Sequence, residues 1–226
     1  LRPRRLGLRQ HARRGRPPGR SRAPTIQDAI DAAVDGDEVD VCPGTGAEAL
    51  SIPTDLVLAS WSGSAADTVL QPGCSGTMVY ASGSSFEMRD LSLVDDCAGE
   101  DGDLVAFWVP EVTVSGCTFT TSDGGLTWNA PSVSVEGARK VSIEDCSFTS
   151  DGSEDQGAVY VSIVSLDTLS LAVEGCAFED NLGDTLHVVS FEGGTIRGQD
   201  LVFRGNGGSA LNVQGAPEGT VYEASL

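Results

Sequence analysis

Cysteines are the first residues of this chain whose type and spacing could do chemistry. Cys117, Cys146 and Cys176 recur within one short motif, and thiolates are ligands for zinc or partners in disulfides. Leu91 and Leu201 stand at the same place in two further copies of that motif. Leucine can neither bind a metal nor form a disulfide, and a row of stacked positions does not converge on one metal ion. The pattern therefore favours cysteines that pack in a core as small apolar side chains.

Aspartates gather in the polar segments that follow each copy of the motif. Carboxylate oxygens on turns are the ligands that Ca²⁺ prefers, so these segments are candidate calcium sites. Their spacing matches neither an EF-hand loop nor the nonapeptide calcium repeat. A solvated acidic edge that keeps the protein soluble is the alternative. The candidate ligands are Asp95, Asp96, Asp101, Asp103, Asp123, Asp151, Asp155, Asp180 and Asp184.

Aromatic residues and one histidine suggest stacking against sugar rings. A strand follows each polar segment, and we expect its valines and leucines to point inward, as Ala210 and Asn212 would in the last of these strands. The residues between these inward positions would then point outward in one row. This outward row would comprise Tyr80, Trp128, Tyr160, His187 and Leu211, of which Tyr80, Trp128, Tyr160 and His187 are the glycan-binding candidates. A slip of one residue in register would bury Trp128 and remove the row.

The repeat motif itself predicts the elements that position these residues. Its clearest copy spans residues 112–119 (VTVSGCTF), with others at 86–93, 141–148, 171–178 and 196–203. A period of 25 to 30 residues with apolar positions at fixed offsets indicates a solenoid. Val112 and Val114 alternate with polar residues as in a strand. The residue before the Cys/Leu position is Asp or Gly in every copy, and both accept a tight left-handed bend.

Each coil should therefore contain a strand, a tight corner, a second strand, a polar loop and a third strand. We place the third strands at 126–129, 158–163, 185–189 and 210–213. Corners that recur in one register favour a parallel solenoid over antiparallel hairpins. Because parallel strands lie about 4.8 Å apart, two neighbouring cysteines of the row could form one disulfide, and this alternative is left open. Cys74 and Cys97, which lie in polar turns, could also pair in an oxidising compartment.

Two family resemblances fit this pattern. Phe178-Glu-Asp-Asn181, Phe203-Arg-Gly-Asn206 and Gly207-Gly-Ser-Ala-Leu211 resemble the Phe-x-x-Asn and Gly-Gly-Ala-Ile repeats of polymorphic outer-membrane proteins. More broadly, residues 25–226 look like the pectate-lyase-like superfamily, and residues 25–33 and 36–44 are similar to its usual opening segment. This resemblance implies an all-β fold, a right-handed parallel β-helix with a short N-terminal capping helix.

The superfamily resemblance also raises polysaccharide lyase or glycosidase activity. Lyases of that superfamily generally pair calcium-binding carboxylates with a basic residue that abstracts a proton. None of the candidates lies in a recognisable family motif, and no residue is assigned a catalytic role. The candidates are Arg89, Arg139, Lys140, His187, Arg197 and Arg204.

The two ends of the chain differ from its middle. Residues 1–22 contain nine arginines and no acidic residue, whereas residues 23–226 hold five basic and all 33 acidic side chains. The leader lacks hydrophobic periodicity and should be disordered. A polyanion-binding tail, a targeting leader and a stretch without specific function all remain open for it. Residues 23–226 form the predicted β-helix, which opens with a helix after Thr25. The last residues would end in mid-coil, so we expect further coils.

Two functions fit these features. The first is a non-catalytic secreted or cell-surface module that binds a polysaccharide or cell-surface glycan, or serves as an adhesive or structural rod. The alternative is a Ca²⁺-assisted polysaccharide lyase or related enzyme. We expect no nucleic-acid partner, because an acidic body repels nucleic acid, and no membrane insertion, because no stretch approaches about 18 apolar residues. Convergence of Asp184, His187 and an arginine in a groove would favour the enzyme.

Overall fold

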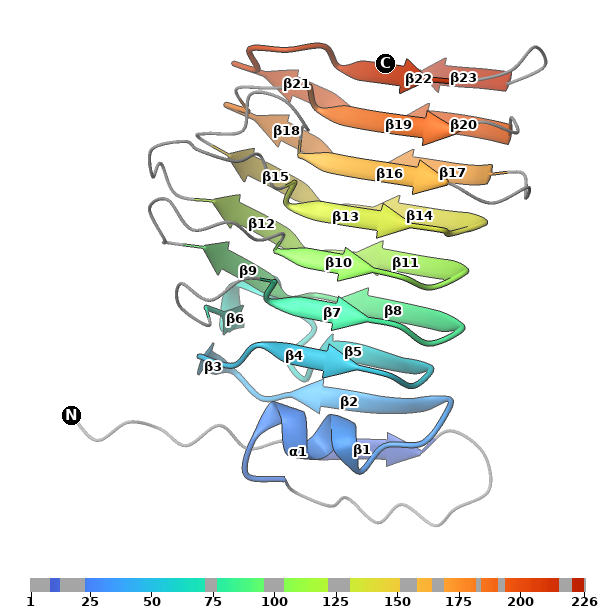
Figure 1. Cartoon of the computed structure of the whole chain (residues 1–226). Helices are drawn as coiled ribbons and strands as arrows, with labels where there is room; N and C mark the ends of the chain where they lie inside the picture. Colours follow the sequence, from blue (N-terminus) through green and yellow to red (C-terminus); the bar gives the residue numbers. More distant parts are fainter. Residues whose placement is uncertain are drawn as a thin grey trace.

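The computed structural model describes residues 9–12, 23–71, 77–95, 104–121, 131–150, 158–163, 169–181, 184–190, 194–215 and 221–225. These residues form a parallel β-helix in which successive strands join three sheets, A, B and C, in turn. Strands of sheet C run to the right across the front of Figure 1 and those of sheet A run to the left behind them, while the chain climbs from α1 to β23. This course is right-handed, as predicted.

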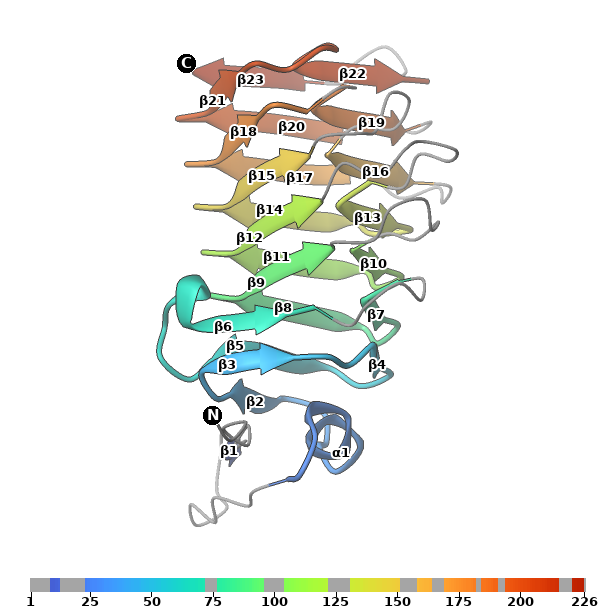
Figure 2. The same ribbon diagram turned by 90° about the vertical axis from the view of Figure 1, so that its left-hand side faces the viewer.

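Equivalent strands of successive coils stack on one another in register. Sheet A contains β1 (Arg9–Ala12), β2 (Asp37–Val41), β5 (Leu56–Ser60), β8 (Ser85–Arg89), β11 (Glu111–Ser115), β14 (Lys140–Glu144), β17 (Leu169–Glu174), β20 (Gly194–Gln199) and β23 (Val221–Ser225). Sheet B, which faces the viewer in Figure 2, contains β3 (Gly44–Gly46), β6 (Thr68–Leu70), β9 (Ser92–Asp95), β12 (Thr118–Thr121), β15 (Ser147–Ser150), β18 (Ala177–Glu179) and β21 (Val202–Arg204). Sheet C contains β4 (Leu50–Ile52), β7 (Val79–Ala81), β10 (Val105–Phe107), β13 (Val133–Glu136), β16 (Val159–Ile163), β19 (Leu186–Ser190) and β22 (Leu211–Gln214).

The tight corner between sheets A and B is confirmed at all five predicted positions. Asp90, Gly116, Asp145, Gly175 and Asp200 have φ between 52° and 63°, the left-handed conformation that glycine and aspartate tolerate best. A Cβ atom at Gly116 would clash with Oδ1 of Asp90, and one at Gly175 with Oδ1 of Asp145. Aspartate and glycine therefore alternate from coil to coil, because the aspartate carboxylate of one coil occupies the space that a Cβ atom at the corner of the next coil would need.

The core is built from rows of identical or similar side chains. Phe119, Phe148, Phe178 and Phe203 stack with ring centroids 4.8, 4.9 and 5.4 Å apart. Such stacking adds dispersion and quadrupole attraction to the burial of apolar area. The rings lie on sheet B, two residues after the Cys/Leu position, and Phe119, Phe148 and Phe178 are fully buried.

The cysteine row is confirmed as core packing. Cys117, Cys146 and Cys176 are buried and free of disulfides. Their thiols point at carbonyl oxygens of Ser115, Glu144 and Glu174, at 3.3, 3.2 and 3.2 Å. Hydrogen bonding between neighbouring thiols and burial raise the pKa of Cys146 and Cys176 well above that of an ordinary thiol. These cysteines are therefore inert. Cys74 and Cys97, the other predicted pair, lie outside the described residues.

The Phe-x-x-Asn motif also has a structural role. Asn181 Nδ2 donates to the carbonyl oxygen of Phe148 at 3.4 Å, and Asn206 Nδ2 donates to that of Phe178 at 2.9 Å. The two amides bond to each other at 2.8 Å. Each asparagine thus ties its coil to the preceding one at the end of sheet B.

Helix α1 (Ile26–Asp31) covers the N-terminal end of the solenoid, as predicted (Figure 1). Thr25 accepts a hydrogen bond from the backbone nitrogen of Asp28, which caps the helix. The Glu48 carboxylate accepts from the backbone nitrogens of Ile26 and Gln27 at 3.2 and 3.0 Å. The remaining helical segment, η1 (Ala65–Asp67), is a single 3₁₀ turn. In the described part of the chain no helix is long and apolar enough to cross a membrane.

Part of the basic leader joins the first strand of the solenoid. Arg9–Ala12 form β1, which pairs antiparallel with β2, whereas the other described strands pair in parallel. The composition of the leader did not predict this strand.

Candidate functional site

The outer face of sheet C carries the row of side chains that the sequence singled out. Tyr80, Tyr160 and His187 occupy one register position along the sheet. The full row, in order from β4 to β22, is Ser51, Tyr80, Ala106, Ser134, Tyr160, His187 and Asn212. From β4 to β19 the residues on either side of each row member are buried in the core, so the predicted alternation of Val159, Val161, Leu186 and Val188 is confirmed. In β22 the flanking Leu211 is 41% exposed.

Two details of the predicted row were wrong. Leu211 pairs with Leu186, and Asn212 takes the place beside His187, so Ala210 and Asn212 do not point inward with Leu211 outward. Trp128 lies outside the described residues, and the sheet C strand of its coil is β13, where Ser134 holds the row position. The third strand of that coil therefore begins seven residues later than the predicted Leu126.

The N-terminal half of this face is open and aromatic. The Tyr80 side chain is 39% exposed and that of Trp108 is 56% exposed. Trp108 directly follows β10, and its backbone nitrogen donates to the Ala81 oxygen at 2.8 Å, which continues the pairing of the two coils. Since Phe107 is buried, Trp108 shares the outer face with Tyr80. Coil spacing and strand rise place their Cα atoms roughly 8 Å apart.

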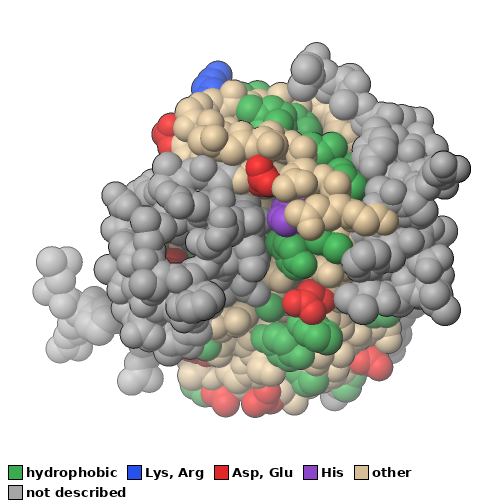
Figure 3. Space-filling model, turned by 45° about the horizontal axis from the view of Figure 1, so that its top comes forward, with side chains coloured by type: hydrophobic (Ala, Val, Ile, Leu, Met, Phe, Trp, Pro, Cys, Tyr) green, Lys and Arg blue, Asp and Glu red, His purple; other side chains and the backbone are tan. Residues whose placement is uncertain are grey.

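The C-terminal half of the same face is polar and largely buried. Ser134, Ser162, Thr185 and His187 are each less than 9% exposed although they belong to the outer side of the sheet. The ring of Tyr160 meets the imidazole of His187 edge-on, with centroids 5.4 Å apart and planes at 88°. Figure 3 looks onto this end of the molecule, where hydrophobic and uncharged surface adjoins the histidine.

His187 is a buried imidazole without hydrogen bonds. Its side chain is 8% exposed, and neither Nδ1 nor Nε2 has a hydrogen-bond partner in the described structure. The same holds for Oγ1 of Thr185, which is fully buried. Leaving such groups unsatisfied costs about 1–3 kcal/mol each, so buried polar atoms of this kind call for an explanation.

Asp184 lies near His187 but is bound by other groups. Its Oδ1 accepts from the backbone nitrogen of Ser209 at 2.8 Å, and its Oδ2 accepts from Asn212 Nδ2 at 2.5 Å. Burial alone would raise the pKa of Asp184, but the hydrogen bonds from Asn212 and Ser209, together with the nearby His187, outweigh it and lower the pKa. Asp184 is therefore a fixed, ionised carboxylate, and it does not orient the imidazole as a catalytic dyad would.

No arginine joins Asp184 and His187. The five basic residues outside the leader lie on sheets A and B or at the corner before β14. Arg89 pairs with Glu38 at 2.6 Å and Glu87 at 3.1 Å. Arg204 lines a cavity of about 200 Å³ next to Thr185, and its guanidinium pairs with Glu179 at 3.1 Å. The convergence that would have favoured a lyase is absent from the part of the chain that the structure describes.

The calcium candidates are only partly within the described residues. Asp96, Asp101, Asp103, Asp123, Asp151 and Asp155 lie outside them. Of the other three, Asp95 ends β9, Asp184 binds Ser209 and Asn212, and Asp180 forms a corner with φ 55°. Among the described side chains no group of three or more His, Cys, Asp or Glu could hold a metal ion. Calcium binding stays a prediction.

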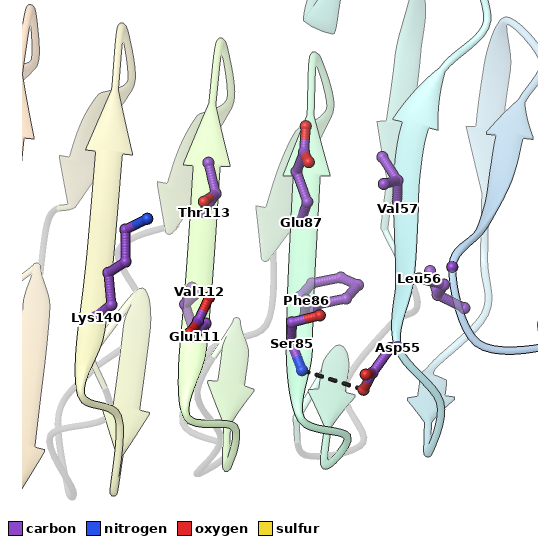
Figure 4. Close-up of a pocket in the computed structure, with 11 residues that line it drawn as sticks. Asp55, Leu56, Val57, Ser85, Phe86, Glu87, Glu111, Val112, Thr113 and Lys140 are labelled. Atoms are coloured by element: carbon purple, nitrogen blue, oxygen red, sulfur yellow. Dashed lines mark hydrogen bonds between the residues drawn. The ribbon is translucent and has the colours of Figure 1, made fainter. Parts of the chain in front are cut away.

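A second hollow lies on the outer face of sheet A (Figure 4). Its volume is about 230 Å³, below the roughly 300–1,000 Å³ of typical small-molecule sites. Glu87, Glu111 and Lys140 project from successive strands along it. Glu111 and Lys140 are register neighbours of opposite charge, and Glu87 pairs with Arg89. At the lower end, Asp55 accepts from the backbone nitrogens of Ser84 and Ser85. These contacts describe a charged, solvated sheet face.

Comparison with known proteins adds little to this geometry. No protein-family model matches the chain, and no curated protein matches its sequence. One similar solved structure is a mutant pectin methylesterase in complex with a hexasaccharide, with 11% identity and a TM-score of 0.44 over 89% of this chain and 88% of that chain. Likeness at this level does not transfer a function.

Proposed function

We propose that the protein is a non-catalytic β-helix module that binds an extended glycan along the outer face of sheet C. The observation that carries this proposal is the pair Tyr80 and Trp108, two exposed aromatic side chains from neighbouring coils on one flat face. Large exposed apolar patches on proteins often mark binding sites. Rings on a flat face suit stacking against the apolar faces of sugars, with their polar edges left to water.

The row continues past this pair, which favours an extended ligand over a single sugar. Tyr160 stands three coils beyond Tyr80 in the same register, or roughly 14 Å along the solenoid axis. His187 follows directly, with its ring against that of Tyr160. Between Tyr80 and Tyr160 the row residues Ala106 and Ser134 are buried, so the open aromatic surface lies at the Tyr80 end of the row.

The non-catalytic form of the proposal rests on what surrounds His187. Acid–base chemistry needs a base within hydrogen-bond reach of the proton that it moves and a group that orients that base. Asp184 is occupied by Ser209 and Asn212, and the basic residues of the described sheets lie elsewhere. A binding module of this kind fits a secreted or cell-surface location.

A glycan array followed by calorimetry on oligosaccharides tests the proposal. We expect the double substitution Tyr80→Ala, Trp108→Ala to weaken binding at least tenfold while the melting temperature stays within a few degrees. Trp61→Ala is the matched control, because Trp61 is 38% exposed but lies in the turn after β5, away from sheet C. Equal loss in both variants would contradict the proposal. Release of unsaturated products from uronic-acid polymers, in Ca²⁺ but not in chelator, would replace it with the lyase alternative.

A further inference from the structure

The distribution of positive charge limits which glycan the sheet C face can take. Nine of the 14 basic residues lie in the leader, and the other five are Arg89, Arg139, Lys140, Arg197 and Arg204. No lysine or arginine occurs in residues 90–138, 141–196 or 205–226, so the strands of sheet C from β10 to β22 carry no lysine or arginine. Arg139 lies in the corner that follows β13 and leads into sheet A. β4 and β7 also contain none.

Negative charge, in contrast, is fixed on this face. Asp184 is held ionised beside His187 by the hydrogen bonds from Ser209 and Asn212. Glu136 ends β13 and is partly exposed on the same sheet. A ligand carboxylate would lose water here without gaining a charge-assisted hydrogen bond from a lysine or arginine of these strands, and it would be repelled by Asp184.

The buried groups at the C-terminal end of the row suit uncharged hydroxyls instead. An imidazole offers one donor and one acceptor when neutral and two donors when protonated, and a sugar hydroxyl can meet either kind of group. Neither nitrogen of His187 has a hydrogen-bond partner, and both are shielded from solvent, while Asn212 lies next to it in register. Because its side chain is more than nine-tenths buried, a hydrogen bond to a ligand would remove a desolvation cost that the unliganded protein carries.

We infer that the glycan bound by sheet C is uncharged, that His187 forms a subsite for its hydroxyl groups, and that uronic-acid polymers are excluded. This inference rests on the proposed function, since it names the class of glycan that the aromatic row would bind. The aromatic pair Tyr80 and Trp108 supplies contact area without selectivity for charge. The groups around His187 supply the selectivity for an uncharged over a charged glycan.

Paired ligands that differ only in charge test the inference. Neutral hexasaccharides of glucose, mannose and galactose are titrated calorimetrically against the full chain, each beside its counterpart oxidised to the carboxylate at C6. We expect at least one neutral hexasaccharide to bind and its oxidised counterpart to bind at least tenfold more weakly at low salt. Equal or tighter binding of the oxidised form would overturn the inference and leave the proposed function standing. Failure of every hexasaccharide in both forms would overturn both.

Two substitutions separate hydrogen bonding from ring packing. His187→Phe keeps a ring against Tyr160 but removes both nitrogens, and it should lower the affinity for the neutral ligand about tenfold. His187→Gln restores a donor and an acceptor and should recover part of that loss, which a merely structural role would not do. Asp184→Asn removes the fixed charge and should raise affinity for the oxidised ligand several-fold. Unchanged binding in His187→Phe, with an unchanged melting temperature, would overturn the His187 subsite.

Discussion

The two faces of sheet C use the same strands in opposite ways. On the inner face one row reads Leu, Val, Val, Val, Val, Leu and Leu from β4 to β22, and its members differ by little more than a methyl group. On the outer face the adjacent row reads Ser, Tyr, Ala, Ser, Tyr, His and Asn over the same strands. Stacked coils require each inner side chain to fill the same space as the one beneath it. The outer row has no such requirement, so its residue types can vary from coil to coil and can be suited to binding a ligand.

The largest expected effect comes from breaking an inner row. Phe148 lies between Phe119 and Phe178, fully buried, with centroids 4.8 and 4.9 Å away. Phe148→Ala should lower the free energy of unfolding by about 3–5 kcal/mol, because it removes a buried ring and leaves a cavity that stacked neighbours cannot close. Urea denaturation measures this. Phe203→Ala, at the half-buried end of the stack, is the matched control and should cost clearly less. Similar costs at both sites would show that the stack does not act as a row.

A second prediction concerns the corner between sheets A and B. Gly116 has φ 61°, and a Cβ atom there would clash with the Asp90 carboxylate. Gly116→Ala should therefore destabilise the protein by about 2 kcal/mol, since a left-handed residue with a side chain costs about 1–2 kcal/mol before the clash is counted. Adding Asp90→Gly should recover part of the loss, because it removes the clashing carboxylate at a position that also has positive φ. A double-mutant cycle without coupling would mean that the two corner residues are independent.

The same contrast explains how much of the molecule the sequence predicted. Asp90, Gly116 and the cysteine row were predictable because a bend or a core position restricts the residue type directly. The alternation of aspartate and glycine was also visible in the sequence, but its cause, a carboxylate beside the next coil, needs the stacked geometry. β13 was misplaced because loop lengths vary. Its Val-Ser-Val begins eight residues before the motif copy at Val141, close to the offset of seven at Val79 and Val105, and this offset was the better signal.

The outer face was the harder part to predict. Trp108 was missed because an exposed position just beyond a strand leaves no periodic trace. Asn212 was misassigned because glycines and a serine precede it, and register there follows from backbone hydrogen bonds such as that from Leu186 to Ala210. A shift of one residue exchanges inward and outward sides, so such errors fall on candidate binding residues first.

The smallest predicted effect concerns a charge on the outer face. Hydrogen bonds from Ser209 and Asn212 lower the pKa of Asp184 in the folded protein, so folding favours its ionised form. Its contribution to stability is present above the pKa of the unfolded chain, about 4, and is lost as pH falls through the lower pKa of the folded state. Because Asp184 is partly exposed, the effect should be well below 1 kcal/mol after solvent screening. Urea midpoints between pH 6 and pH 3 should therefore fall slightly less in Asp184→Asn than in the unsubstituted protein. An equal fall in both would mean that Asp184 titrates as it does in the unfolded chain. A steeper fall in Asp184→Asn would contradict the fixed carboxylate on which the exclusion of uronic acids depends.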